Sequence, residues 1–302
     1  MTIAGNLSET DVQRIEQCCD PSLRKIRDLI YKVAGIYLTE DKILFLQERV
    51  QRRMKERDLS QLPDYYDLLT IKQDRDTELR ELLNEIADGE TRLFRCIPHL
   101  DALRNSLLPE LTQVKSHMMQ RKLRVWCAGC STGEEAYTLA MVLTDEMSTK
   151  YPGWRFDLIA TDLNERALAL AKEGVYAEEE MQKTPAYFRK EYFQSTGAGM
   201  AVKPEIKRCV SFRLLNLVDD NKMMFMKGMN IISCCNVMIH FNVESKRRVV
   251  HHFYSNLLPG GYLFLGESES LHGIPNEFRL VHFPQVTTYF RPPAPAFPGM
   301  KP

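Results

Sequence analysis

Short apolar segments alternate with amphipathic helical segments through the later part of this chain, and that alternation restricts the possible folds more than any other feature. Strands that alternate with helices form a mostly parallel sheet with helices on both faces. The sequence therefore predicts an α/β fold with a doubly wound, Rossmann-like sheet. Its expected strands are residues 123–128, 156–160, 229–235 and 261–265, and its expected helices are residues 134–147, 165–173 and 243–258.

The region from residue 22 to residue 86 has a different pattern. Apolar residues such as Leu23 and Ile26 recur there every three or four positions, a spacing typical of amphipathic helices. Gly35 and Pro63 mark places where one helix ends and another begins. No strand-like alternation interrupts the region. The sequence therefore predicts a small all-helical domain ahead of the sheet domain.

Two further segments interrupt or follow the sheet pattern. Glycines and Pro204 separate short β-prone pieces within residues 192–212, which predicts a small β-hairpin insertion. Residues 292–302 contain five prolines, and we expect them to form a flexible tail. The expected division of the chain is a helical domain (1–88), a sheet domain (89–291) and the tail (292–302).

Composition and charge exclude several classes of protein. The chain has 302 residues with 40 Lys and Arg against 40 Asp and Glu, so its formal net charge is zero and no overall basic field indicates nucleic-acid binding. It has no apolar run long enough to span a membrane and no signal peptide, which predicts a cytoplasmic protein without membrane insertion. Eight cysteines are too few for a disulfide scaffold in a chain of this length.

A run of small residues, 129–133 (Gly-Cys-Ser-Thr-Gly), joins the first expected strand to the first helix of the sheet. Small residues let the backbone approach a ligand closely, and a helix N-terminus offers N–H groups without helical partners. The spacing differs from G-x-G-x-x-G, so a dinucleotide is not favoured. Glu134 and Glu135 follow in the first turn, where they would repel phosphate and suit a cationic ligand. The alternative is ordinary helix capping, with Ser or Thr ahead of Glu.

Asp162 directly follows the second expected strand. An acid at that position of a doubly wound sheet can accept hydrogen bonds from both hydroxyl groups of a ribose. The alternative is that Asp162 caps the helix that starts near Glu165. Together with the loop at 129–133, this acid favours a ligand that contains adenosine and lacks phosphate.

Several motifs along the chain carry a family resemblance. They lie in the same order as in the CheR family of chemotaxis protein methyltransferases, which this chain resembles from about residue 22 to residue 291. Because the motifs are independent of one another, the resemblance is specific. They are residues 130–140, 160–164, 173–176, 216–217, 236–241 and 258–268.

The resemblance implies an enzyme that uses S-adenosylmethionine to methylate glutamate side chains of chemoreceptors, leaving S-adenosylhomocysteine. It implies that Asp162 holds the ribose, that Asn216 and Leu217 lie by the adenine, and that Arg95 lies near the methionine carboxylate and the reacting centre. Arg95 and His240 are the residues expected to orient the acceptor or the cofactor. The full set of implied cofactor-binding residues is Thr91, Arg95, Glu135, Asp162, Asn216, Leu217, Cys235 and Asn236.

The resemblance also implies a partner for the helical domain. In the family the N-terminal helices face the methylation helices of the receptor, and in this chain a basic set, Lys42, Arg49, Arg52 and Lys55, is available for that contact. By charge alone the same residues would be a solvated helix face, because acidic residues interleave with them. We expect the protein to be a monomer.

This sequence departs from the family pattern at four positions. The family's segment Asn-x-Thr-x-Phe-Phe-Arg corresponds to residues 89–95, where Gly89 and Leu93 replace Asn and Phe. Cys235 replaces Arg, and His240 replaces Tyr. Two alternatives therefore stay open: a cofactor-binding regulatory or scaffold protein that has lost turnover, and a methyltransferase that acts on a different protein carboxylate.

Four cysteines raise the possibility of a metal site. Cys127 and Cys130 form a C-x-x-C pair, and Cys234 and Cys235 end a strand that neighbours the first one in a doubly wound sheet. The spacing that would support a zinc site is incomplete, and a cofactor loop favours small residues in any case. The sequence therefore predicts no metal.

Overall fold

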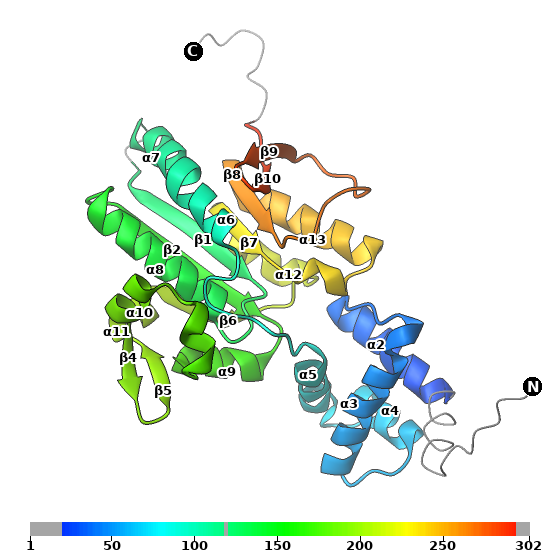
Figure 1. Ribbon diagram of the computed structural model, residues 1–302. Coiled ribbons are helices and arrows are strands. Elements are labelled where there is room, and N and C mark those ends of the chain that lie inside the picture. Colours follow the sequence, from blue (N-terminus) through cyan, green and yellow to red (C-terminus); the bar gives the residue numbers. More distant parts are fainter. Residues whose placement is uncertain (1–19, 118–119, 294–302) are drawn as a thin grey trace, which may run out of the picture. The chain divides into compact units, whose positions relative to one another are not determined.

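The computed structural model describes residues 20–117 and 120–293 (Figure 1). The chain divides into two compact units. The helical unit contains the chain up to Asp88 together with the short segment His240–Asn242. The sheet unit contains Gly89–Ile239 and the chain from Val243 onward. Most of the expected tail, 294–302, lies outside the described residues.

The helical unit packs its helices around one apolar core, which confirms the expected all-helical domain. Its apolar residues fall at helical spacing, so each helix turns one buried stripe inward. Leu23, Ile26, Ile30, Leu46 and Val50 are fully buried. The helices are α2 (Pro21–Ala34), η1 (Glu40–Lys42), α3 (Ile43–Glu56), α4 (Leu62–Thr70) and α5 (Arg75–Ile86).

A buried ion network crosses this core. The guanidinium of Arg53 on α3 donates to both carboxylate oxygens of Glu78 on α5, at 2.9 and 2.8 Å. The hydroxyl of Tyr65 on α4 donates to the same carboxylate at 2.9 Å, and Arg57 approaches it at 3.0 Å. Arg53 and Glu78 are only 4% and 1% exposed. The network therefore ties three helices together through one carboxylate that is shielded from water.

The sheet unit is built on seven strands in the order β6-β2-β1-β7-β8-β10-β9. The first five are parallel to one another, and β10 and β9 are antiparallel additions at one edge. This confirms the doubly wound, mostly parallel sheet. The strands are β1 (Lys122–Ala128), β2 (Arg155–Asp162), β6 (Val210–Leu214), β7 (Met229–Cys234), β8 (Leu257–Leu265), β9 (Arg279–Phe283) and β10 (Val286–Phe290).

Helices cover both faces of this sheet (Figure 1). Successive strand residues point to opposite faces. On β1, Val125 belongs to the core that includes α7 and α8, whereas its neighbour Trp126 packs edge-on against Phe253 of α13, with ring centroids 5.3 Å apart. The helical elements of the unit are α6 (Ile97–Ala102), η2 (Leu103–Leu107), α7 (Leu108–His117), α8 (Glu134–Thr149), α9 (Glu165–Glu173), η3 (Glu179–Lys183), α10 (Ala186–Tyr192), α11 (Pro204–Lys207), α12 (Asp220–Met223), η4 (Met224–Met226), η5 (Met238–His240, whose last residue is grouped with the helical unit) and α13 (Val243–Asn256).

The insertion is shorter than the sequence suggested. β4 (Phe193–Thr196) and β5 (Gly199–Val202) form the expected hairpin, and β3 (Val175–Tyr176) joins it to make a three-stranded sheet. The assignment of residues 210–212 to the insertion is wrong, because they belong to β6 and pair with β2 in the main sheet. β6 is a half-exposed edge strand, so its sequence lacks the continuous apolar run that marks the buried strands.

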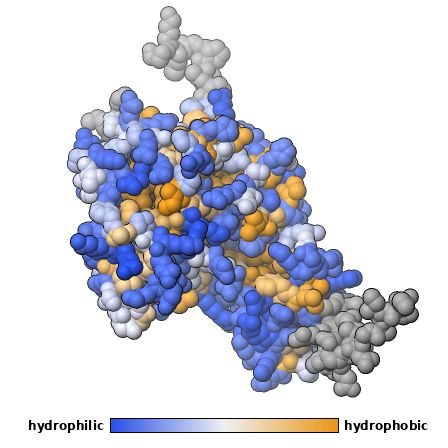
Figure 2. Space-filling model, viewed as in Figure 1, coloured by the Kyte–Doolittle hydropathy of each residue, from blue (hydrophilic) through white to orange (hydrophobic). Residues whose placement is uncertain are grey.

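Most of the surface visible in Figure 2 is hydrophilic, and hydrophobic residues gather on it in a few patches. Large apolar side chains that are well exposed include Ile71, Phe225 and Val243. Single exposed apolar residues of this kind are common on globular proteins. Among the residues that the structure describes, no helix is long and apolar enough to cross a membrane.

Candidate functional site

The candidate site lies at the edge of the sheet where four parallel strands end. β1 ends at Ala128, β2 at Asp162, β6 at Leu214 and β7 at Cys234. In open α/β sheets, ligands bind in the crevice outside these carboxyl ends. The sheet topology therefore brings to one edge several residues that are far apart in the sequence: the loop 129–133, Asp162, Asn216, Leu217, Cys235 and Asn236.

The loop after β1 is held tightly against β2. The amides of Gly129 and Cys130 both donate to the carbonyl of Thr161, at 2.8 and 3.0 Å. Gly129 has φ +77°, and a Cβ at this residue would lie 2.2 Å from the side chain of Val237. Only glycine satisfies both the backbone conformation and the space available there.

The start of α8 supports a ligand site rather than ordinary capping. The N-cap residue is Gly133, with φ +96°, and glycine has no side chain that could accept a hydrogen bond from the first turn. The hydroxyl of Thr132 instead donates to the carboxylate of Glu134 at 2.8 Å. The alternative reading of this loop as a Ser or Thr cap is therefore wrong. The first-turn N–H groups of α8 therefore receive no side-chain cap from Gly133.

Asp162 anchors this loop from the neighbouring strand. One carboxylate oxygen accepts from the amide of Ser131 at 2.7 Å, and the other accepts from the amide of Asn164 at 2.8 Å. Burial raises the pKa of this carboxyl above its usual value. Asp162 does not cap α9: the cap is Asn164, whose side chain accepts from the amide of Ala167 at 3.0 Å. Each carboxylate oxygen can accept a further bond, which leaves capacity for a ligand hydroxyl.

Glu135 lies in the first turn of α8, directly after the loop. Its carboxylate accepts a hydrogen bond from the hydroxyl of Ser233 on β7. Burial is the main cause that raises the pKa of Glu135 to about 6. The ionised form of this carboxylate can pair with a cationic group. Because its pKa is near neutrality, the pairing responds to pH.

The chain beyond β7 and β6 supplies the remaining expected residues. Asn236 has φ +61°, and its amide donates to the carboxylate of Glu269 at 2.7 Å. The side chain of Asn216 accepts from the amide of Val218 at 3.1 Å, and Leu217 is buried. Sequence reasoning missed Glu269, whose carboxylate also accepts from the amides of Gly266 and Ile239 and so fixes this turn.

The segment with Thr91 and Arg95 belongs to the same unit and is bonded to the site. The hydroxyl of Ser131 donates to the carbonyl of Gly89 at 3.2 Å, and the amide of Phe94 donates to the hydroxyl of Thr138 on α8 at 3.0 Å. Arg95 is exposed, and its guanidinium donates to the carbonyl of Glu90 at 3.1 Å. Arg95 is therefore held close to the segment that adjoins the loop while its side chain stays accessible.

His240 is grouped with the helical unit. The amide of Tyr37 donates to the carbonyl of His240 at 2.8 Å. Burial and the positive charge of Lys42 lower the pKa of this imidazole below its usual value.

The basic residues expected to meet a partner differ in their environments within the helical unit. Lys42 and Lys55 are exposed. Arg49 lies over the ring of Phe45, 4.8 Å from its centroid, and Arg52 pairs with Glu85 at 2.8 Å. The two lysines are therefore the members of the set best placed to meet an acidic partner.

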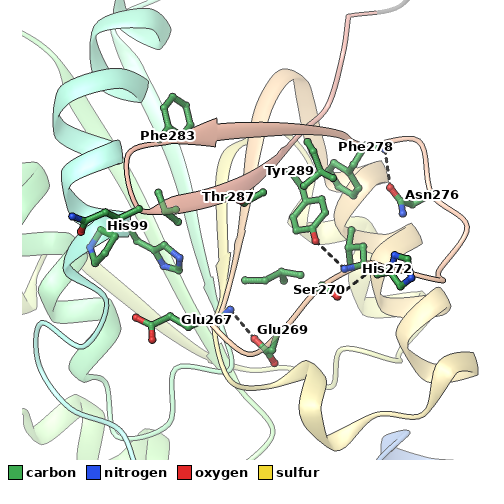
Figure 3. Close-up of a pocket in the computed structure, with 17 residues that line it drawn as sticks. His99, Glu267, Glu269, Ser270, His272, Asn276, Phe278, Phe283, Thr287 and Tyr289 are labelled. Carbon is green, nitrogen blue, oxygen red and sulfur yellow. Dashed lines mark hydrogen bonds between the residues drawn. The ribbon is translucent and has the colours of Figure 1, made fainter.

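A cavity of about 850 Å³ opens beside β8 in the sheet unit. It is lined by the start of α6, the chain after β8 and the β9–β10 hairpin (Figure 3). The hydroxyl of Tyr289 on β10 accepts from the amide of Leu271, in the chain after β8, at 2.9 Å. None of the residues expected to bind the cofactor lines this cavity, so the candidate cofactor site rests on the strand ends and not on the cavity.

The chemistry of the strand ends fits an adenosine that carries a cationic group. A buried carboxylate with spare acceptor capacity suits a ribose, and a second carboxylate beside Ser233 suits an ammonium group. The glycine loop lets the ligand approach the backbone. The Asp162 carboxylate is already bonded to the amides of Ser131 and Asn164, and the Glu135 carboxylate accepts from the Ser233 hydroxyl.

Comparison with known proteins connects this chain to one family. Residues 89–287 match the family model described as "CheR methyltransferase, SAM binding domain", and residues 21–87 match "CheR methyltransferase, all-alpha domain". A chemotaxis protein methyltransferase of Borreliella burgdorferi is 33% identical over 255 residues, which cover 84% of this chain and 89% of that protein. Chemotaxis protein methyltransferase 1 of Pseudomonas aeruginosa is 33% identical over 261 residues, covering 84% and 92%. The chemotaxis protein methyltransferase of Escherichia coli is 32% identical over 268 residues, covering 86% and 88%.

Proposed function

Because this chain belongs to the CheR methyltransferase family and uses S-adenosylmethionine, we propose that it methylates glutamate side chains on the cytoplasmic helices of chemoreceptors. The observation that carries the proposal is the hydrogen bond from the Ser131 amide to Asp162, in the loop that leads into the uncapped start of α8. The chain also matches the family over both of its domains. The products are a glutamate methyl ester and S-adenosylhomocysteine.

Several residues at the strand ends would hold the cofactor. Asp162 accepts from the ribose hydroxyls, and Glu135 pairs with the ammonium of the methionine part. Asn216 and Leu217 lie by the adenine, and Arg95 meets the methionine carboxylate. The remaining members of the proposed cofactor set are Thr91, Cys235 and Asn236.

The reaction requires the protein to position the acceptor and the cofactor, and it does not require acid–base catalysis. S-adenosylmethionine supplies an activated methyl group. A glutamate acceptor has a reference pKa of about 4.3, so at pH 7 it is already the nucleophilic carboxylate. Alignment of its oxygen with the methyl carbon and the sulfur therefore provides most of the rate enhancement. Exclusion of water assists, because the carboxylate and the sulfonium neutralise each other in the transition state.

The direct test is transfer of labelled methyl groups into purified receptor cytoplasmic fragments. We expect base-labile label that is lost when the methylated glutamates are replaced by alanine. Cofactor binding without transfer would indicate a regulatory protein, and transfer to another protein carboxylate would replace the proposed acceptor. Either result contradicts the proposal.

Replacing Arg95 by alanine is expected to reduce this transfer about 10- to 100-fold, because one hydrogen bond to a charged group contributes about 1.5–3 kcal/mol. The neighbouring Arg92→Ala is a matched control, since Arg92 is also exposed in the same segment. Rates of both variants are measured with saturating receptor. Wild-type turnover in the Arg95 variant would remove its assigned role.

Cofactor affinity is expected to depend on pH through Glu135. Its pKa of about 6 in the free site means that the carboxylate is ionised above pH 6 and loses its charge below it. Because the ammonium group pairs with the ionised form, affinity for S-adenosylhomocysteine should fall about tenfold between pH 7 and pH 5. Calorimetry at each pH measures this. Glu135→Gln should bind weakly and with a flatter profile, and an unchanged slope in that variant would assign the titration to another group.

Reversing the charge of both Lys42 and Lys55 to Glu is expected to lower kcat/KM for the receptor about tenfold at low salt, because basic patches steer acidic partners. The difference should shrink as salt screens the charges. Affinity for S-adenosylhomocysteine should stay at the wild-type value. Lys72→Glu, an exposed lysine elsewhere in the helical unit, is the control. Equal kcat/KM in the wild-type protein, the double variant and the Lys72 variant would rule out Lys42 and Lys55 as receptor contacts.

A further inference from the structure

Three soft metal-binding side chains meet in the sheet unit. Cys96 directly precedes α6, His99 lies in the first turn of α6, and Cys235 directly follows β7. Their sulfur and ring-nitrogen atoms all lie within 4.8 Å of one another. His99 is buried and the two cysteines are partly buried. Folding therefore brings together three donors from two separate stretches of the chain.

The spacing of these donors is close to what one tetrahedral ion requires. Zinc binds thiolate sulfur at about 2.3 Å and imidazole nitrogen at about 2.0–2.1 Å. Tetrahedral angles then put a sulfur and a nitrogen about 3.6 Å apart, and two sulfurs about 3.8 Å apart. The observed distance from Cys235 Sγ to His99 Nδ1 is 3.8 Å. Small side-chain adjustments would bring the donors into coordination distance.

Neighbouring groups hold two of the three donors in place. The hydroxyl of Ser233 contacts the sulfur of Cys235 at 3.6 Å and also donates to the Glu135 carboxylate. The ring of His99 packs against Phe264 on β8, with centroids 5.0 Å apart. Outer contacts of this kind orient metal ligands and tune their affinity.

We propose that Cys96, His99 and Cys235 bind one zinc ion, with a water molecule as the fourth ligand. Two thiolates and an imidazole are the ligands that zinc prefers, and three protein ligands with an open fourth position are a recurrent zinc arrangement. Binding releases the thiol protons to solvent, since only thiolates coordinate the ion. Methyl transfer itself needs no metal, and Cys235 is the one residue that this site shares with the proposed cofactor set.

The proposed site differs from the set of four cysteines that the sequence suggested as a possible metal site. Cys127, Cys130 and Cys234 are buried, and only Cys235 of that set belongs to the cluster. Cysteine spacing alone predicts no metal, because it does not include His99, which lies 136 positions from Cys235 along the chain. The competing use of the same atoms is a disulfide between Cys96 and Cys235, formed by exchange with an oxidised thiol such as glutathione disulfide.

The test uses the full chain, reduced and stripped of metal. Cobalt(II) is added as a spectroscopic probe and then displaced with zinc. We expect one equivalent of cobalt, the visible bands of a tetrahedral ion, a thiolate-to-cobalt charge-transfer band, and loss of all of them with one equivalent of zinc. Single variants Cys96→Ser, Cys235→Ser and His99→Gln should each lower zinc affinity about 100-fold or more, a larger loss than outer-contact changes cause.

Cys209→Ser is the matched control, because Cys209 is another partly exposed cysteine of the same unit outside the cluster. Circular dichroism shows which variants fold, and three independent ligand variants keep the test informative if one does not. Wild-type cobalt bands in all three ligand variants, or loss of the bands in Cys209→Ser, would overturn the proposal. So would a reduced protein that takes up no metal, including one in which glutathione disulfide then links Cys96 to Cys235.

Discussion

Replacing Glu78 by alanine is expected to lower the free energy of unfolding of the helical unit by about 3–5 kcal/mol. The carboxylate of Glu78 accepts two hydrogen bonds from the Arg53 guanidinium and one from Tyr65, and Arg53 donates a further one to Glu56. Removing it takes two of these bonds from the Arg53 guanidinium, whose side chain is only 5% exposed, and leaves Glu56 at the surface as its remaining carboxylate partner. A buried charge that loses its buried partner costs more than the lost side chain itself.

Chemical denaturation monitored by helical circular dichroism measures this loss. Glu48→Ala, on the exposed face of α3, should change stability by less than about 0.5 kcal/mol. The double variant Arg53→Met with Glu78→Leu should recover much of the stability, because apolar residues of similar size can replace a buried ion pair. A Glu78→Ala protein as stable as Glu48→Ala would contradict the role given to the network.

Replacing Asp162 by alanine is expected to weaken binding of S-adenosylhomocysteine by about 100-fold or more. Two ribose hydroxyls that donate to one carboxylate would each lose a charge-assisted hydrogen bond of about 1.5–3 kcal/mol. The variant also removes the partner of the Ser131 amide, which holds the loop 129–133 against β2. Both effects act on the cofactor and neither on the receptor contact.

Calorimetry with S-adenosylhomocysteine measures the affinity, and thermal melting without ligand reports whether the fold is intact. Asp157→Asn is the control, because Asp157 lies on the same strand and pairs with Lys122 at the surface, at 2.6 Å. Asp162→Asn separates the two effects, since an amide oxygen can still accept from one backbone N–H but carries no charge. Wild-type affinity in Asp162→Ala would refute the ribose assignment and, with it, the proposed cofactor geometry.

Local periodicity was enough to predict most elements of the fold. The segment expected to be helical at 165–173 forms α9 (Glu165–Glu173), and the strand expected at 123–128 lies within β1 (Lys122–Ala128). These elements bury one face or both, so their apolar residues recur with the period of the backbone. β6 and β9 escaped prediction because they are the two edge strands of the sheet and most of their residues are exposed, which weakens that period. The short strand β10 was also not predicted.

The sequence by itself determined the doubly wound sheet and the neighbourhood of Asp162 and the loop 129–133, because carboxyl ends of adjacent parallel strands must meet. Only the tertiary structure decided that Asn164, and not Asp162, caps α9, since this depends on which oxygen meets which amide. It alone brought Cys96 and His99 to Cys235. Distances between side chains that are far apart in the sequence follow from the order of the strands and the packing of α6. The periodicity of apolar residues within one segment does not encode that order or that packing.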